Sequence, residues 1–252
     1  MRSLVRKVGD WLPHGYGDAS RQLGLFVLAE LSYELVRGIA DGERVQAIVN
    51  GQNVIALEKG LGSYFEPGFQ ALFLDHQWVI DFANFIYMNS HFVVTTTFLI
   101  WLYIFRNQHF YFVRNMFLVA MALALVGYAL LPTAPPRMFD GFTDTITDYA
   151  QVNHDSGLVK VFINPFAAIP SMHCAFALMI GVTGALIARR KITKVAWAFY
   201  PVLVLWVVVV TANHFWIDAA AGYLVAILAA LAAREVLARA RPAAWSFRPA
   251  TT

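Results

Sequence analysis

The sequence predicts an all-α protein, built as a bundle of six membrane-spanning helices. Of its 252 residues, 59% are hydrophobic and only 14% are charged, and the mean hydropathy is +0.56. Soluble domains are about 45–50% apolar and about 25% charged, so the composition indicates an integral membrane protein. Long apolar runs recur along the chain, and basic residues collect in alternate connections between them. These two patterns set the number of helices and their orientation.

Six apolar runs approach or exceed the roughly 20 residues that cross a bilayer. In chain order they cover residues 20–38, 82–104, 112–131, 172–188, 195–212 and 215–237. The first run is interrupted by Glu30, Glu34 and Arg37, and the second contains Asn84, Asn89 and His91. We see no internal repeat and no interdomain linker, so residues 1–252 are expected to form one membrane domain.

Basic residues set the orientation, because they concentrate in the cytoplasmic connections of membrane proteins. They lie before the first run, on either side of the short connection between the second and third, between the fourth and fifth, and at or beyond the end of the sixth: Arg2, Arg6, Lys7, Arg106, Arg114, Arg189, Arg190, Lys191, Lys194, Arg234, Arg239 and Arg241. The long connection 132–170 has only Arg137 and Lys160 against four aspartates. We therefore expect both termini in the cytoplasm of a bacterium and residues 132–170 outside its plasma membrane.

Residues 41–81 are expected to form short amphipathic helices between the first two spans. Apolar and polar residues alternate there at roughly helical spacing, and Gly60, Gly62 and Pro67-Gly68 break the pattern. Such helices commonly lie along the membrane interface. Two interpretations stay open. The helices cover a site or guide a lipid headgroup towards it, or they only pack against the bundle and have no role in catalysis.

Several functions are disfavoured by composition. The first residues lack the compact apolar core and small-residue cleavage site of a signal peptide. A single cysteine, Cys174, excludes an intramolecular disulfide and a cysteine-based metal cluster. The calculated pI near 9.0 reflects basic cytoplasmic edges, which suit anionic lipids better than nucleic acid. We expect no cofactor and no nucleic-acid partner, and the sequence does not set the oligomeric state.

Three short motifs place ionisable groups beside apolar runs. Pro170-Ser171-Met172-His173 begins the fourth run, His214-Phe215-Trp216-Ile217-Asp218 begins the sixth, and Pro132-Thr133-Ala134-Pro135-Pro136-Arg137 follows the third. Polar groups are costly at membrane depth and usually mark function there. All three motifs fall on the expected outer side, so we predict a single site formed from them.

The residue types favour chemistry on phosphate. His214 and Asp218 are four apart and can touch on a helix, so the carboxylate can fix the imidazole tautomer; alone, this spacing would indicate only a structural hydrogen bond. Asn213 stands where an N-cap is expected. Ser171 is a predicted N-cap with His173 in the first turn, and helix N-termini favour anions. Arg137 can grip two phosphate oxygens.

A metal-independent mechanism follows from these parts. His214, aided by Asp218, attacks phosphorus and becomes a phosphohistidine. His173 donates a proton to the leaving oxygen and later activates the acceptor. Arg137, Ser171 and the helix N-termini stabilise the charge on the phosphoryl oxygens.

With these motifs, the chain resembles the type-2 phosphatidic acid phosphatase superfamily over roughly residues 80–237. The resemblance rests on the Ser171-to-His173 peptide, the His214-x-x-x-Asp218 spacing and Arg137 in a proline-rich segment. It implies six spans with the site outside, His173 as acid and His214 as nucleophile. The forms Pro-Thr-Ala-Pro-Pro-Arg and Thr-Ala-Asn-His are closer to the inositolphosphorylceramide synthase-like branch, which implies transfer of a phosphorylated headgroup between lipids.

The sequence departs from the superfamily pattern at three positions. Met172 replaces the usual glycine, Leu130 the usual lysine, and Val208 the usual arginine. Two phosphate-binding cations are therefore missing from their expected places. Lys160, Asn213 and His154 are the candidates to replace them.

Alternatives remain beside a lipid phosphatase or phosphotransferase. A small proton-coupled transporter also uses intramembrane His and Asp, although we see no inverted repeat of the kind such folds often show. His173, His214 and Asp218 could bind zinc, but Arg137 would repel a cation. The sequence does not identify the lipid or the acceptor.

Overall fold

The computed structural model describes residues 12–39, 44–150 and 166–237, and this part of the chain is built from helices. An isolated bridge between Thr133 and Ala167 is the only β pairing within these ranges. The helical elements, in chain order, are α2 (Gly15–Ile39), α3 (Arg44–Gly60), α4 (Glu66–Leu74), α5 (Gln77–Asn89), the π-helical turn η2 (Ser90–Val94), α6 (Thr95–Phe105), α7 (Asn107–Leu130), the short η3 (Pro136–Met138), α8 (Thr145–Ala150), α10 (Met172–Ile187), α11 (Lys191–Val210), α12 (Trp216–Leu231) and η4 (Ala232–Leu237).

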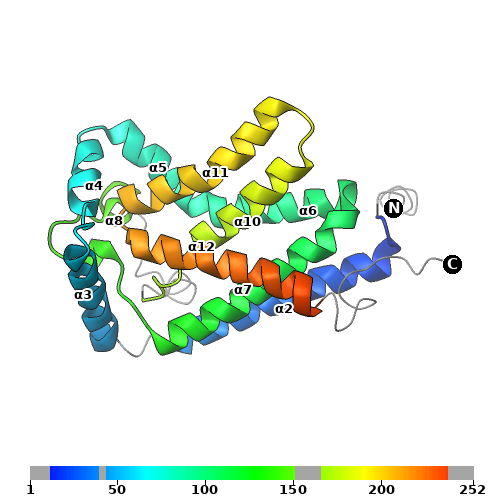
Figure 1. Ribbon diagram of the computed structural model, residues 1–252, viewed down its shortest axis with the longest axis horizontal. Coiled ribbons are helices and arrows are strands. Elements are labelled where there is room, and N and C mark those ends of the chain that lie inside the picture. The colour runs from blue at the N-terminus through cyan, green and yellow to red at the C-terminus, as the bar shows by residue number, and fades with distance from the viewer. Residues whose placement is uncertain (1–11, 40–43, 151–165, 238–252) are drawn as a thin grey trace.

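The long helices pack side by side. α10 lies between α11 and α12, α12 packs on α7, and α2 runs along α7 (Figure 1). Glycine allows the closest approaches: Gly184 of α10 faces the ring of Trp197 of α11, and Gly222 of α12 faces the backbone of Ser171 at the start of α10. These contacts leave no room for a larger side chain at either glycine.

Within the described residues, three helices are long and apolar enough to cross a membrane: α7, α11, and α12 continued by η4. α5 and α6 together would make a fourth span, but they are bent by 50° across η2. The run 82–104 is therefore not one straight helix, and α5 begins earlier, at Gln77. α10 is apolar but only 16 residues long. α2 contains the run 20–38 but is not among the spans, because it carries several charged residues. Six spans are not established among the described residues.

The outer surface of the helices is apolar, as a bilayer requires. Large apolar side chains are well exposed on several of the long helices, including Phe85, Leu130, Leu186, Ile192 and Leu224. Water would disfavour so much exposed apolar surface, whereas lipid chains can cover it.

The segment between α2 and α5 is helical, as expected, and it buries two acidic side chains. In α3 and α4 apolar side chains such as Val45, Leu57 and Leu72 are exposed, while Glu58 and Glu66 are completely buried. α3, α4 and α8 gather at one end of the bundle, around the start of α12 (Figure 1). Glu58 and Glu66 therefore point into the protein, towards the predicted site.

Candidate active site

The three motifs predicted to form one site meet at this end of the bundle. The rings of His173 and His214 have centroids 6.0 Å apart. The N–H of Ser171 donates to the carbonyl of Asp218 at 3.0 Å, and the N–H of Arg137 donates to the carbonyl of Ala212 at 2.9 Å. Backbone hydrogen bonds thus join segments that are about 40 to 80 residues apart in the sequence.

His214 lies in the short connection between α11 and α12. The N–H groups of Asn213 and His214 both donate to the carbonyl of Val208, at 3.0 and 3.1 Å, and this closes the last turn of α11. Ala212 adopts a positive φ of 51°, which turns the chain sharply before the histidine. The N-cap of α12 is Phe215. The prediction that Asn213 is the N-cap is therefore wrong, because the helix begins two residues later than the capping pattern suggested.

The predicted contact between His214 and Asp218 is present. Nδ1 of His214 lies 3.4 Å from Oδ2 of Asp218, and that oxygen also accepts from the N–H of Phe215 at 2.9 Å. Asp218 is fully buried and His214 is only 6% exposed. Asp218 therefore caps the start of α12 and lies beside the imidazole that precedes it, without a hydrogen bond to Nδ1 of His214.

His214 is kept neutral by its surroundings. Burial, followed by the positive charge of Arg137, lowers the pKa of His214 to about 3, and a hydrogen bond to the backbone of Ala168 acts in the opposite direction. An unprotonated imidazole keeps a lone pair that can attack phosphorus or accept a proton.

Ser171 and His173 are placed by the start of α10. Ser171 is the N-cap, as predicted, and its Oγ accepts from the N–H of Cys174 at 3.4 Å. The ring of Tyr87 from α5 stacks on His173, with centroids 4.4 Å apart and an angle of 19° between the planes. Sequence reasoning missed Tyr87, because nothing near it in the chain indicates that α5 reaches the site.

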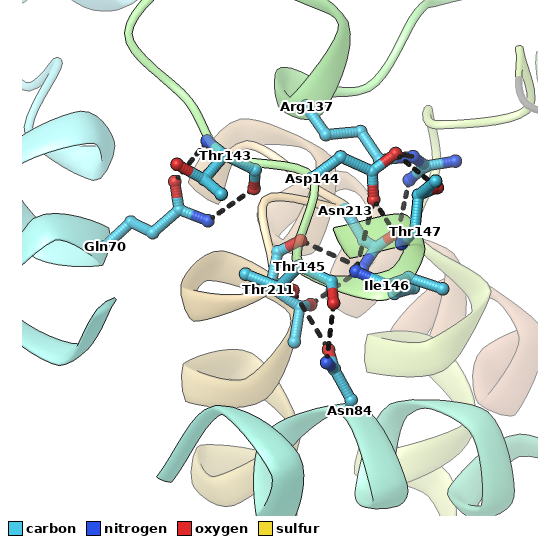
Figure 2. A network of polar contacts seen from close by, with 10 residues as sticks. All are labelled: Gln70, Asn84, Arg137, Thr143, Asp144, Thr145, Ile146, Thr147, Thr211 and Asn213. Atoms are coloured by element: carbon cyan, nitrogen blue, oxygen red, sulfur yellow. Dashed lines mark hydrogen bonds and ion pairs between the residues drawn. The ribbon is translucent and has the colours of Figure 1, made fainter. Parts of the chain in front are cut away.

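Arg137 is held from two sides, as Figure 2 shows. Its guanidinium donates to Oδ1 of Asn213, and its Nε lies 3.8 Å from a carboxylate oxygen of Asp144. Asp144 accepts from the N–H groups of Ile146 and Thr147, at 3.2 and 3.1 Å, and so fixes the start of α8. The side chain of Arg137 is mostly buried, in a position that α8 and the turn after α11 define together.

Asn213 connects Arg137 to the end of α11. Its amide nitrogen donates to the carbonyl and to the hydroxyl of Thr211, at 3.2 and 2.8 Å, while its oxygen accepts from Arg137. These contacts make Asn213 a support for the guanidinium. The sequence-based role of Asn213 as a phosphate ligand stays a prediction.

The positions of the missing cations differ in environment. Val208 is fully buried in an apolar cluster beneath the site, and Leu130 is 78% exposed at the end of α7. Two of the candidates to replace these cations, Lys160 and His154, lie outside the described residues. Among the described residues no group of three or more His, Cys, Asp or Glu side chains could hold a metal ion, so the geometry gives the zinc alternative no support.

A helical bundle with an apolar outer surface, paired histidines and a supported arginine defines a membrane protein suited to phosphoryl chemistry. A family model of the PAP2 superfamily matches residues 52–232, and the chain belongs to this superfamily. Comparison with curated proteins and with solved structures gave no significant match. Members of the superfamily are phosphatases and phosphotransferases. The family and the apolar helices together identify the chain as an integral membrane protein of that enzyme class.

Proposed function

We propose that the protein is a lipid phosphatase or phosphotransferase that forms a phosphohistidine on His214. The observation that carries this proposal is the convergence of a neutral, buried His214 with His173, whose ring centroid is 6.0 Å away, beside the guanidinium of Arg137. A neutral nucleophile, a second imidazole and a fixed cation are the groups that phosphoryl transfer needs.

The first step breaks the bond between phosphorus and the leaving oxygen. The lone pair of His214 forms the new N–P bond, and the leaving alkoxide takes a proton from His173. Arg137 and the hydroxyl of Ser171 are the proposed ligands of the phosphoryl oxygens, with the N-terminus of α10 adding its dipole. Asp218 stabilises the positive charge that develops on the imidazole of His214.

The second step returns the enzyme to its starting state. Neutral His173 takes a proton from water or from an alcohol, the resulting oxygen attacks phosphorus, and the N–P bond breaks. Water as acceptor gives a phosphatase, and a lipid alcohol gives a phosphotransferase. The scheme uses no metal ion and no cofactor.

A headgroup transferase is the second candidate, and the charge of the site favours it. With Leu130 and Val208 at the expected cation positions, Arg137 is the cation that the described residues bring to the phosphate. A phosphodiester carries one negative charge and needs less compensation than a phosphomonoester. This supports a phosphoinositol-type headgroup moved between lipids, in line with the resemblance to the inositolphosphorylceramide synthase-like branch.

We further propose six spans with both termini in the cytoplasm and the site facing outwards, in the plasma membrane of a bacterium. The basic residues of the α6–α7 and α10–α11 connections support this orientation. A proton-coupled transporter, the candidate from a different class, would move a substrate across vesicles without changing it chemically.

The decisive experiment incubates purified protein with radiolabelled lipid phosphates and phosphoinositol lipids, with and without alcohol acceptors, in the presence and absence of a chelator. We expect turnover that the chelator leaves unchanged and an acid-labile phosphoenzyme. Free phosphate as the sole product identifies a phosphatase, and a new phosphodiester identifies a transferase.

Histidine variants supply the controls for this experiment. His214→Ala should abolish the phosphoenzyme, and His173→Ala should lower turnover about 10²–10⁴-fold, the usual range for loss of general acid–base catalysis. His76→Ala changes an exposed histidine immediately before α5 and should leave turnover unchanged. Undiminished turnover by His214→Ala would refute the proposal.

A further inference from the structure

Three fully buried carboxyl groups surround the start of α12. Glu58 comes from the end of α3, Glu66 is the first residue of α4, and Asp218 belongs to α12 itself. All three are 0% exposed. Buried acids are rare unless they are paired or hydrogen-bonded, and no lysine or arginine contact is recorded for Glu58 or Glu66 among the described residues. Their partners are backbone N–H groups and, between Glu58 and Glu66, each other's carboxyl groups.

Each carboxyl group accepts from one of three consecutive N–H groups. Asp218 accepts from Phe215 at 2.9 Å, Glu66 from Trp216 at 3.1 Å, and Glu58 from Ile217 at 3.4 Å. The first N–H groups of a helix have no partner within the helix. Here one is satisfied by the helix's own aspartate and two by glutamates that lie about 150 residues earlier in the chain.

Two further hydrogen bonds hold the α3–α4 segment in place beside the start of α12. The indole N–H of Trp216 donates to the carbonyl of Ser63 at 3.1 Å, and the second oxygen of Glu66 accepts from the N–H of Phe65 at 3.0 Å. The residue immediately before these anchored N–H groups is His214. A shift of α3 or α4 would therefore move the imidazole and Asp218 together.

The carboxyl groups cannot all be ionised without strong mutual repulsion. Burial, then the charge of Glu66 and to a lesser extent that of Asp218, raises the pKa of Glu58 to about 9, while the hydrogen bond from Ile217 acts in the opposite direction. Tyr64 also faces this cluster, and its pKa is raised by burial and by both glutamates. At neutral pH Glu58 is therefore protonated and the cluster carries one charge fewer.

We propose that Glu58 and Glu66 are positioning residues of the His214 site, and that the site keeps its geometry only while Glu58 carries its proton. This inference rests on the proposed function. Loss of the proton places an additional buried negative charge beside Glu66 and Asp218. The resulting repulsion drives α3 and α4 away from the start of α12, which loosens His214.

The test compares the pH dependence of kcat in wild type and in Glu58→Gln. Glutamine keeps the oxygen that accepts from Ile217 and mimics the neutral acid, so kcat at pH 7 should stay within about twofold. At pH 10 a group with a pKa of about 9 is roughly tenfold more ionised than protonated, so Glu58→Gln should exceed wild type about tenfold. Loss of the proton from His173 at high pH would lower kcat of both proteins equally. It therefore cancels in the ratio of kcat for Glu58→Gln to kcat for wild type.

Glu58→Ala and Glu66→Ala complete the test, since both remove the acceptor. We expect each to lower kcat at least tenfold at pH 7 while KM changes little, because neither side chain is proposed to touch the substrate. A constant ratio of Glu58→Gln to wild type between pH 7 and 10 would refute the inference, even if the alanine variants fail to fold. Absence of turnover by wild type on every substrate would instead refute the proposed function.

Discussion

His214 lies beside a carboxyl group, but its pKa is lowered, because burial and the charge of Arg137 dominate. The imidazole is thus uncharged at any pH where the enzyme is expected to work. Arg137 contributes in one way that the structure shows, since its guanidinium helps to keep His214 neutral, and in a second way that we propose, as a ligand of the phosphate. Asp144, 3.8 Å from the guanidinium, balances this charge when no substrate is bound.

A neutral buried histidine makes folding stability depend on pH. An unfolded chain binds a proton at His214 below pH 6.5, the ordinary pKa, whereas the folded protein binds it only near pH 3. The contribution of His214 to the free energy of unfolding is therefore fully present well above pH 6.5, and it decreases as the pH falls below this value. The loss should be about 1.4 kcal/mol at pH 5.5.

Thermal unfolding in detergent between pH 5 and 7.5 measures this effect. The control is His214→Gln, in which the position does not titrate while the other six histidines are unchanged. Wild type should lose more stability than His214→Gln as the pH falls. Parallel pH dependences for the two proteins would mean that His214 is protonated as easily in the folded state as in the unfolded one.

At the scale of the helices, the site depends on the close packing of α10 against α12. A Cβ atom on Gly222 would lie 2.2 Å from the carbonyl oxygen of Ser171, which is backbone and cannot rotate away. The hydrogen bond from Ser171 to the carbonyl of Asp218 lies in the same contact. Glycine at position 222 therefore sets how closely α12 packs against the start of α10, and with it the distance between the segments that carry the two histidines.

Gly222→Ala should consequently impair both stability and catalysis. Overpacking commonly costs about 1–3 kcal/mol, and separation of the helix starts should lower kcat by at least tenfold. Gly24→Ala is the matched control, because a Cβ at that position of α2 meets nothing within 4 Å. Unfolding temperature and turnover of both variants measure the effect. Wild-type turnover in Gly222→Ala would show that this spacing does not control the site.

Local patterns in the sequence predicted the helical runs and the residues of the three motifs, because hydrophobic periodicity and cap chemistry act over a few residues. The N-cap of α12 was predicted wrongly, since the acceptors that anchor the helix start come from Asp218 inside the helix and from Glu58 and Glu66 in distant segments. Tyr87 and Asp144 were missed for the same reason. Long-range hydrogen bonds leave no pattern in the neighbouring sequence, and neither does the bend between α5 and α6.

At the scale of the whole molecule, the ends of the bundle differ in character. The candidate site, α3, α4 and α8 occupy one end, and the α10–α11 connection with Arg189 and Arg190 lies away from it (Figure 1). Basic residues favour the cytoplasmic side of a membrane. The arrangement therefore predicts that Asp140, an exposed residue three positions after Arg137, faces the outside and that Arg190 faces the cytoplasm.

Cysteine labelling can test this orientation with little background, because the single native cysteine, Cys174, is fully buried. Asp140→Cys and Arg190→Cys introduce one accessible thiol at each end of the bundle. In intact bacterial cells with a permeable outer layer, a membrane-impermeant maleimide should label Asp140→Cys but not Arg190→Cys. After the plasma membrane is opened, both should react, which controls for thiol reactivity. The reverse pattern would place the histidines on the cytoplasmic side, where the enzyme would meet lipid phosphates of the inner leaflet instead.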